Sequence, residues 1–469
     1  MSVSISPPNL VPHDDNLPGR CTVAFRTIGC KLNQCETAQM QQALLAEGYR
    51  LVDWDEPATI RVINTCTVTA RSDRTCRHQI RLAKRLDPGC LLAVTGCLAQ
   101  VDPGTVAAIP GVDLVLGNPD KLRLADFLRR HLESKAVAHS QPKPTVCVSP
   151  YAGSLSFEKE VLVSFPGYTR AFLKIQTGCD SSCTYCIVPR ARGPARSMPL
   201  TQVLAQVRSL AASGYREVVL TGIDLGSWGR DTGEGSLADL LRVLVAESAV
   251  DRYRLSSVEP LEMDAALLDV IEAAGERVAQ HFHLPLQSGS DSVLRRMGRP
   301  YSAAEYLEVV RSVAARFPEA ALGADVIVGF PGETEEEFQE TLAFVADSPL
   351  TYLHVFSYSD RPGTPAAAMK PKVQPEVIQE RNARLRALGQ EKKTAFRTRL
   401  VGTEQQVLIL GESAPDGRVL GLTGNYMEVL LPVPESYTNR FARVCLEKVL
   451  PDGCWEGRIL AIEAGDGPP

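Results

Sequence analysis

The feature that most constrains this chain is a group of three cysteines, Cys179, Cys183 and Cys186, spaced CxxxCxxC in TGCDSSCTYCIVPRARG. The group follows an apolar segment, 172–178, that predicts a buried strand. Three thiolates bind three irons of a 4Fe-4S cluster and leave the fourth iron open. A zinc site more often has four donors, and a two-cluster ferredoxin repeats CxxC and supplies a fourth cysteine. We therefore expect a catalytic cluster, with three neighbouring structural cysteines as the alternative.

Length and composition place the chain among soluble globular proteins. It has 469 residues, of which 44% are hydrophobic and 22% charged, and this length predicts about two to four domains. The sequence has neither an apolar stretch long enough to cross a membrane nor the layout of a signal peptide at residues 1–20. We expect a cytoplasmic protein with a disordered tail over 1–20 and no membrane partner. In that compartment, thirteen cysteines favour metal binding over disulfides.

Charge is unevenly distributed along the chain. The formal net charge of −5 argues against a protein that is basic throughout. Residues 71–85 nevertheless carry six basic side chains and one acidic one, a net +5, at a spacing that places most of them on one helical face. Residues 370–399 carry nine basic and three acidic side chains, a net +6. Either run suits contact with phosphates, and a solvated helix face explains each run equally well.

Residues 21–132 alternate short apolar strands with helices, which predicts an open α/β sheet. The strands are predicted over 22–29, 61–65 and 91–96, and the helices over 33–49, 70–86 and 121–132. Cys30, Cys66 and Cys97 each lie at or just beyond the carboxyl end of a predicted strand. Because such ends meet at one edge of a parallel sheet, we expect the three thiols to form a second three-ligand iron-sulfur site. Chance placement is the alternative.

Residues 133–169 are predicted to be a linker, and 170–393 to form a partial (β/α)6 barrel. The predicted strands and helices of this barrel are, in order, strands 172–178, 217–223, 253–259, 281–287, 324–329 and 353–358, and helices 200–213, 237–247, 264–274, 301–317, 334–347 and 375–393. The active site is expected at the C-terminal strand ends. There Gly222 and Gly329 allow close approach to a ligand, and Ser257, Glu259 and Gln287 offer hydrogen bonds to a ribose or an amino-acid group. Turn formation is the alternative role of the glycines.

The last region, 394–469, is predicted to be a small antiparallel β-barrel. Its predicted strands are 406–410, 419–422, 427–431, 440–446 and 456–462. Oligonucleotide-binding folds share this architecture. RNA binding, stabilisation and dimerisation remain open as roles, because the fold alone does not choose between them.

Taken together, these motifs resemble the radical S-adenosylmethionine (SAM) methylthiotransferases over roughly residues 21–462. The segments that carry the resemblance are TIGCKLNQCE, INTCTVTARSD, VTGCLAQ, FLKIQTGCDSSCTYC, VVLTGIDLGSWG, HLPLQSGSD, DVIVGFPGETEEEF and HVFSYSDRPGTPAA. GCKLNQ, INTCTVT and GLTGNYMEVLL are similar to the MtaB-type branch, which modifies N(6)-threonylcarbamoyladenosine in tRNA. Other branches act on isopentenyladenosine in tRNA or on an aspartate of a ribosomal protein.

The resemblance implies two 4Fe-4S clusters. Cys179, Cys183 and Cys186 would bind the SAM-cleaving cluster, and Cys30, Cys66 and Cys97 an auxiliary one. The expected cofactor-binding residues are Tyr185, which fits the family's aromatic position, together with Gly222, Ser257, Glu259, Gln287 and Gly329. Cys35 is not a family ligand. Inert packing is its expected role, as for the other cysteines outside the two trios, with capture or exchange of sulfur as the alternative.

The implied reaction uses two SAM molecules per turnover. One methylates a sulfur at the auxiliary cluster, and the other gives a radical that removes hydrogen from carbon 2 of adenine 37. The implied partners are tRNA, an unidentified electron donor and an unidentified sulfur donor. We expect the basic helix at 71–85 and the C-terminal TRAM-like barrel to hold the tRNA.

Two other functions remain as alternatives. Methylthiolation of a ribosomal protein is disfavoured by the terminal barrel and the branch motifs. A non-catalytic iron-sulfur RNA-binding protein is disfavoured by the intact CxxxCxxC and the polar strand ends.

Overall fold

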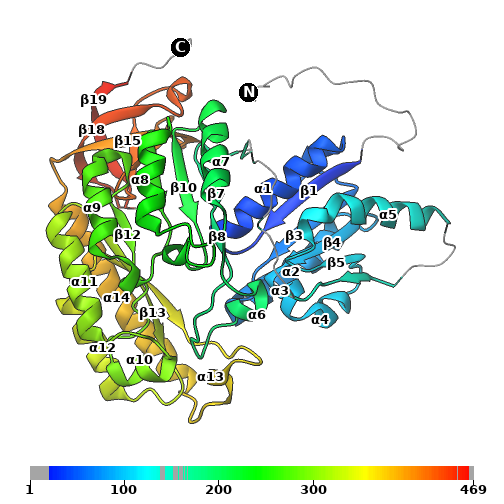
Figure 1. Cartoon of the computed structure of the whole chain (residues 1–469), viewed down its shortest axis with the longest axis horizontal. Helices are drawn as coiled ribbons and strands as arrows, with labels where there is room; N and C mark the ends of the chain where they lie inside the picture. Colours follow the sequence, from blue (N-terminus) through cyan, green and yellow to red (C-terminus); the bar gives the residue numbers. More distant parts are fainter. Residues whose placement is uncertain are drawn as a thin grey trace.

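The computed structural model describes residues 21–137, 143–151, 157, 162, 164–165, 167–451 and 453–463. Within these ranges the chain forms an open parallel sheet, a partial (β/α) barrel and a small closed β-barrel (Figure 1). The α/β class and the three-part architecture predicted from the sequence are confirmed. The expected tail at residues 1–20 lies outside the described ranges.

The N-terminal sheet has six parallel strands in the order β2-β1-β3-β4-β5-β6. Its strands are β1 (Thr22–Thr27), β2 (Arg50–Val52), β3 (Ile60–Thr65), β4 (Leu91–Gly96), β5 (Leu114–Leu116) and β6 (Thr145–Cys147). The three strands that the sequence did not predict, β2, β5 and β6, have three residues each, too few for a periodic pattern. β6 comes from the segment expected to be a linker.

Helices cover both faces of this sheet. They are α1 (Lys31–Ala46), α2 (Ala70–Leu86), α3 (Cys97–Val101), α4 (Pro103–Ala107) and α5 (Leu124–Val137). One core holds Ile80 and Ala83 of α2, and the other holds Leu44 of α1 and Leu128 of α5. β3 and β4 are buried along their whole lengths, as central strands covered on both faces are expected to be.

The second unit contains all six strand-helix pairs predicted from the sequence. Its strands are β7 (Ala171–Lys174), β10 (Glu217–Thr221), β11 (Arg252–Leu255), β12 (His281–His283), β13 (Ala321–Val328) and β14 (Tyr352–Ser357). Two parallel ladders, β11-β10-β7 and β12-β13-β14, are joined where the amide of Ala279 donates to the carbonyl of Tyr253 (2.8 Å) and that of Val258 to the carbonyl of His283 (3.0 Å). The result is a partial barrel.

The helices of the barrel lie on its outside. They are α7 (Leu200–Ala212), α8 (Leu237–Glu247), α9 (Ala265–Ala274), α11 (Ala303–Arg316), α12 (Glu335–Asp347) and α14 (Pro375–Arg399). A further helix, α10 (Asp291–Met297), was not predicted. It is short and ends at Gly298 in the left-handed conformation, so the next residue, Arg299, turns back toward the cysteine loop.

The C-terminal unit is a closed five-stranded barrel in the order β15-β16-β17-β19-β18. Its strands are β15 (Glu404–Ser413), β16 (Val419–Thr423), β17 (Glu428–Leu431), β18 (Phe441–Val449) and β19 (Trp455–Ile462). The expectation of a wholly antiparallel barrel was wrong at one pair, because β17 and β19 run parallel. An odd number of strands cannot close into a ring with every neighbour antiparallel.

This small barrel docks on the N-terminal ends of β10 and β11. Arg252 and Arg254 donate to the carboxylate of Glu217 at 2.6 and 2.9 Å, and all three side chains are fully buried. Their remaining guanidinium nitrogens donate to four barrel carbonyls, those of Gln406, Leu422, Thr423 and Gly424. This buried group of charges thus fixes the C-terminal barrel to the partial (β/α) barrel, which lies centrally in the chain.

No helix in the described ranges is both long enough and apolar enough to cross a bilayer.

Candidate functional site

The CxxxCxxC loop leaves the C-terminal end of β7 and β8 (Gln176–Thr177) and leads into α6 (Val188–Arg192). Each of its three sulfurs accepts one hydrogen bond. The amide of Ser181 donates to Cys179 Sγ (3.3 Å), the amide of Val188 to Cys186 Sγ (3.4 Å), and Arg299 Nη1 to Cys183 Sγ (3.2 Å). Donors of this kind stabilise negative charge on sulfur, which suits a thiolate ligand. Cys179 Sγ also donates to Asp224 Oδ2 (3.9 Å).

Packing against α10 and α13 (Pro365–Ala368) fixes the shape of this loop. The amide of Thr184 donates to the carbonyl of Met297 (2.9 Å), and the carbonyl of Thr184 accepts from the amide of Ala366 (2.9 Å). Tyr185 packs with Met297 and Phe330 in a small apolar cluster. The loop is therefore held on both sides.

Burial makes the two outer thiols of the loop poor acids in the absence of a metal. It raises the pKa of Cys186 to about 12 and also raises the pKa of Cys179. A bound metal ion deprotonates a coordinating thiol outright. Buried thiols that nevertheless receive hydrogen-bond donors fit a metal cluster better than free cysteines.

The predicted SAM-binding residues lie at the C-terminal strand ends. Gly222 follows β10, Ser257 and Glu259 follow β11, Gln287 follows β12, and Gly329 follows β13. Glu259 forms an ion pair with Arg299, the residue that also contacts Cys183. The structure thus brings these residues to the same end of the barrel as the cysteine loop.

Two of these residues, Gly329 and Gln287, are held by hydrogen bonds from their backbone amides. The amide of Gly329 donates to Glu333 Oε2 (2.7 Å), and a Cβ at Gly329 would lie 2.4 Å from a side-chain carbon of Ile378. Gln287 is buried and donates its amide to the carbonyl of Asp325 (2.8 Å). The sequence suggested that Gly329 allows a ligand to approach closely. In the structure, the group that approaches Gly329 closely is the side chain of Ile378 on α14.

The second cysteine trio gathers at one edge of the N-terminal sheet. Cys30 precedes α1, Cys66 follows β3, and Cys97 opens α3 directly after β4. Burial raises the pKa of Cys66 to about 11, and the neighbouring Cys97 and Cys30 add to this rise. Gly29 has φ +116°, and a Cβ there would lie 2.8 Å from the Cβ of Cys66. Only glycine allows the Cys30 turn to come this close to Cys66.

Two further cysteines flank this site. Cys76 of α2 is fully buried, accepts from the amide of Cys66 (3.4 Å) and donates to its carbonyl (3.3 Å). It therefore supports the backbone of Cys66. Cys35 is buried in the core that α1 shares with the central barrel, which matches the packing role expected for it.

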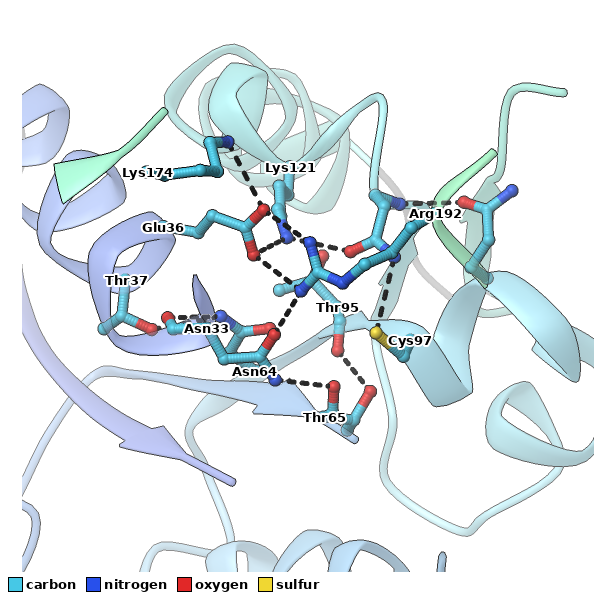
Figure 2. Close-up of polar contacts among 12 residues, drawn as sticks. Asn33, Glu36, Thr37, Asn64, Thr65, Thr95, Cys97, Lys121, Lys174 and Arg192 are labelled. Carbon is cyan, nitrogen blue, oxygen red and sulfur yellow. Dashed lines mark hydrogen bonds and ion pairs between the residues drawn. The ribbon is translucent and has the colours of Figure 1, made fainter. Parts of the chain in front are cut away.

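A buried charge network joins the second cysteine trio to the central barrel. Figure 2 shows Glu36 of α1 surrounded by Arg192, Lys121 and Lys174. Arg192 donates to both carboxylate oxygens, at 2.9 and 3.1 Å, and Lys174 lies 3.3 Å away. Burial alone would raise the pKa of Glu36, but the three cations hold it well below its usual value. All four side chains are at most 3% exposed.

This network also reaches the cysteine edge. Arg192 Nη2 donates to Asn33 Oδ1 (2.6 Å), and Asn118 Nδ2 lies 3.7 Å from Cys97 Sγ and donates to the carbonyl of Ala191 (2.6 Å). Apart from Cys97, sequence reasoning missed all of these residues. The one available signal was a glutamate placed among apolar positions of a helix, and its partners lie 85 to 156 residues away.

The basic helix predicted over residues 71–85 is α2, and its outer face is basic. Arg71, Arg74, Arg81 and Arg85 are exposed, and no described carboxylate lies within ion-pair distance of them. Lys84 instead pairs with Asp113 (3.1 Å). In the second basic run, Arg381 and Arg384 pair with Glu335 of α12, so part of that run's charge serves to dock α14.

Comparisons with known proteins match both units. The family model for the Radical SAM superfamily matches residues 173–345, and the model described as Uncharacterized protein family UPF0004 matches residues 22–117. A Threonylcarbamoyladenosine tRNA methylthiotransferase MtaB from Aquifex aeolicus is 41% identical over 87% of this chain and 96% of that protein. The protein of the same name from Bacillus subtilis is 37% identical over 91% and 94%.

The chain is also similar to a relative with a different name and to a solved structure. A tRNA-2-methylthio-N(6)-dimethylallyladenosine synthase from Geobacillus thermodenitrificans is 35% identical over 90% of this chain and 80% of that protein. Among solved structures, the radical SAM methyltransferase TsrM from Kitasatospora setae superposes with a TM-score of 0.55 at 18% identity. That superposition covers 74% of this chain and 77% of TsrM, and supports the fold alone.

Proposed function

The chain belongs to the radical SAM methylthiotransferases, and from this membership we propose that it adds a methylthio group to carbon 2 of N(6)-L-threonylcarbamoyladenosine at position 37 of tRNA. The MtaB relatives from Aquifex aeolicus and Bacillus subtilis are covered over 96% and 94% of their lengths, so the proposal concerns the whole enzyme. Two cysteine trios at strand ends, one in each α/β unit, are the structural observation that supports it most directly.

We assign a 4Fe-4S cluster to each trio. Cys179, Cys183 and Cys186 would hold the cluster that binds SAM, because hydrogen-bond donors reach all three sulfurs. Cys30, Cys66 and Cys97 would hold an auxiliary cluster, which the close turn at Gly29 supports. Once bound, these groups supply the one-electron chemistry and the methylthio group. Such chemistry is needed because carbon 2 of adenine has neither an acidic proton nor a leaving group.

The polar strand ends of the central barrel would hold SAM. We assign this role to Tyr185, Gly222, Ser257, Glu259, Gln287 and Gly329, which lie at the end of the barrel that carries the cysteine loop. Arg299 holds Glu259 and Cys183 in a fixed relation, so the cofactor site and the cysteine loop are positioned together.

The tRNA would be held by surfaces outside this site. The exposed arginines of α2 lie on the unit that carries the second trio, and we propose that they contact the tRNA backbone. We assign the C-terminal barrel as a TRAM-like domain that also binds the tRNA. An adenosine in the single-stranded anticodon loop can be splayed out and inserted between the two units. An electron donor and a sulfur donor complete the reaction.

The substrate assignment can be tested in a strain that lacks this protein. Mass spectrometry of its tRNA nucleosides is expected to show threonylcarbamoyladenosine without its 2-methylthio form, and the gene on a plasmid should restore that form. A normal level of the methylthio form in the deletion strain would refute the substrate assignment. Loss of methylthio-isopentenyladenosine instead would assign the protein to the other tRNA branch.

A further inference from the structure

One face of β13 points into the central barrel and carries Asp325. Leu322, Ala324 and Val326 alternate along the strand and belong to the core that contains Val313 of α11 and Phe338 of α12. Because side chains alternate between the two faces of a strand, Asp325 between them points away from the helices, to the inside. In the parallel register Asp325 is paired with His354 of β14, which shares its face.

Asp325 is the centre of a cluster of imidazoles on this inner face. Its Oδ1 lies 2.9 Å from His283 Nε2 and 3.3 Å from His354 Nδ1. The hydroxyl of Tyr352 lies 3.1 Å from His283 Nδ1 and 2.8 Å from His281 Nε2. The side chains of His354 and Asp325 are 56% and 26% exposed, so a ligand can reach them.

A cation without an acidic partner lies nearby. Lys31 is the first residue of α1, directly after Cys30, and no described carboxylate lies within ion-pair distance of its ammonium. That ammonium lies 5.7 Å from the ring centre of Tyr426, which Arg170 and Arg254 also approach, at 5.6 and 4.8 Å.

Among the described residues, Glu217 is the carboxylate that pairs with Arg170 and Arg254. It already binds Arg170, Arg252 and Arg254. This corner of the described structure therefore has an excess of positive charge, and Lys31 is its unpaired member. Such a corner suits an anion.

Aromatic contacts connect Lys31 to the imidazole cluster. The ring of Tyr426 stacks on His281 with centroids 4.7 Å apart, and His281 stacks on Tyr352 at 5.8 Å. Lys31 and Asp325 are thus linked through Tyr426, His281, Tyr352 and His283, which form a continuous line of contacting side chains. Cys30 lies beside one end, and Glu259, at the cofactor end of the barrel, is close enough to Asp325 for the two charges to interact.

We propose that Lys31, Asp325 and His354 bind the threonylcarbamoyl group on N6 of the substrate adenine, an assignment that rests on the proposed function. For the reaction, carbon 2 must face the cofactor end of the strands. Carbon 6 flanks the same ring nitrogen as carbon 2, and its N6 substituent leaves the ring at an angle to the C2–H bond, toward the inner face that carries Asp325 and His354. There Lys31 pairs with the threonyl carboxylate, Asp325 accepts a hydrogen bond from a ureido N–H, and His354 donates to a ureido or threonyl oxygen. These contacts distinguish this substrate from an adenine with an apolar N6 group.

The two histidines and the carboxylate also resemble a divalent metal site. The test therefore includes metal content as an outcome.

Binding of anticodon stem-loops tests this proposal. Two loops, with threonylcarbamoyladenosine or plain adenosine at position 37, are titrated onto cluster-loaded protein with SAM under anaerobic conditions. The wild type is expected to prefer the modified loop, and Lys31→Gln to lose about tenfold or more of its affinity for that loop only, whereas Lys31→Arg retains most of it. Arg242→Gln, which removes an exposed cation of α8, is the matched control and should match the wild type.

A second variant tests the Asp325 end of this line. His354→Ala is expected to weaken binding of the modified loop severalfold and to leave the plain loop and the iron content unchanged. If Lys31→Gln and His354→Ala still prefer the modified loop as strongly as the wild type does, and the wild type methylthiolates that loop, this inference is overturned. The proposed function then stands. A wild-type protein that ignores the modification would overturn the proposed function as well. One equivalent of zinc that is lost in His354→Ala would assign the imidazole cluster to a metal and overturn its role here.

Discussion

Arg299 bridges Cys183 and Glu259. Its Nη1 donates to Cys183 Sγ at 3.2 Å, and its Nη2 forms an ion pair with the Glu259 carboxylate. One guanidinium therefore joins the loop that carries the CxxxCxxC motif to the strand end expected to hold SAM.

This contact predicts a change in redox behaviour. A positive charge and a hydrogen bond at a cluster thiolate favour the reduced, more negative cluster. Arg299→Gln is therefore expected to lower the midpoint potential of the cluster assigned to Cys179, Cys183 and Cys186. Redox titration followed by electron paramagnetic resonance measures it. Arg299→Lys keeps the charge and should shift the potential less, and an unchanged potential in Arg299→Gln would contradict the contact.

Glu36 is expected to be a major contributor to stability. Its removal takes away the carboxylate that Arg192 and Lys121 share in the buried interior, and breaking a buried ion pair costs about 3–5 kcal/mol. Glu36→Gln should lower the thermal unfolding midpoint markedly. Glu47→Gln, which removes an exposed glutamate paired with Arg129, is the control and should change stability by less than about 1 kcal/mol. Equal effects of the two substitutions would contradict the network.

The same carboxylate predicts a pH dependence. Because the folded pKa of Glu36 is lowered, its contribution is complete above the unfolded value of about 4.3 and is lost as pH falls toward the folded value. The stability difference between wild type and Glu36→Gln should therefore be constant near neutral pH and should shrink below about pH 4. Calorimetry of the metal-free proteins across this range measures it. A difference that does not change with pH would show that Glu36 is not ionised in the folded protein.

Glu217 should hold the small barrel in place. In Glu217→Gln, three guanidiniums lose their shared carboxylate, and the hydrogen bonds from Arg252 and Arg254 to the barrel carbonyls weaken. Limited proteolysis is expected to cut faster between α14 and β15, with the iron content unchanged. Unaltered cleavage in this variant would show that other interactions suffice to dock the barrel.

The outer face of α2 should contribute non-specific tRNA affinity. Arg74→Gln and Arg81→Gln, combined, remove two exposed cations. The variant is expected to bind modified and unmodified tRNA more weakly to the same degree, and the slope of log affinity against log salt should fall by about one for each phosphate that the protein no longer neutralises. A titration over several KCl concentrations checks this. An unchanged slope would place the tRNA on another surface.

The order of elements was predictable because long apolar segments alternate with helical ones and end in polar motifs. The positions of Cys30, Cys66 and Cys97 after three strands were predictable for the same reason, since parallel strands end at one edge. Strands such as β5 were not predictable, because three residues carry no period and their pairing depends on neighbours already in place.

The polar contacts of the site were beyond the reach of the sequence. Glu36 and Arg192 are 156 residues apart, and nothing in either segment identifies the other as its partner. Arg299 contacts Cys183 because α10, itself unpredicted, ends at Gly298 and reverses the chain. Contacts of this kind are created by tertiary packing, so they become visible only in the folded structure.

A chain that methylthiolates threonylcarbamoyladenosine in tRNA should act on an anticodon stem-loop that carries this nucleoside at position 37. Mass spectrometry of the stem-loop tests this after anaerobic incubation with reconstituted protein, SAM, dithionite and a sulfide source. We predict the 2-methylthio nucleoside together with 5′-deoxyadenosine from the wild type, and neither product from Cys183→Ala. A stem-loop that gains no methylthio group, although both clusters are present and SAM is cleaved, would contradict this function.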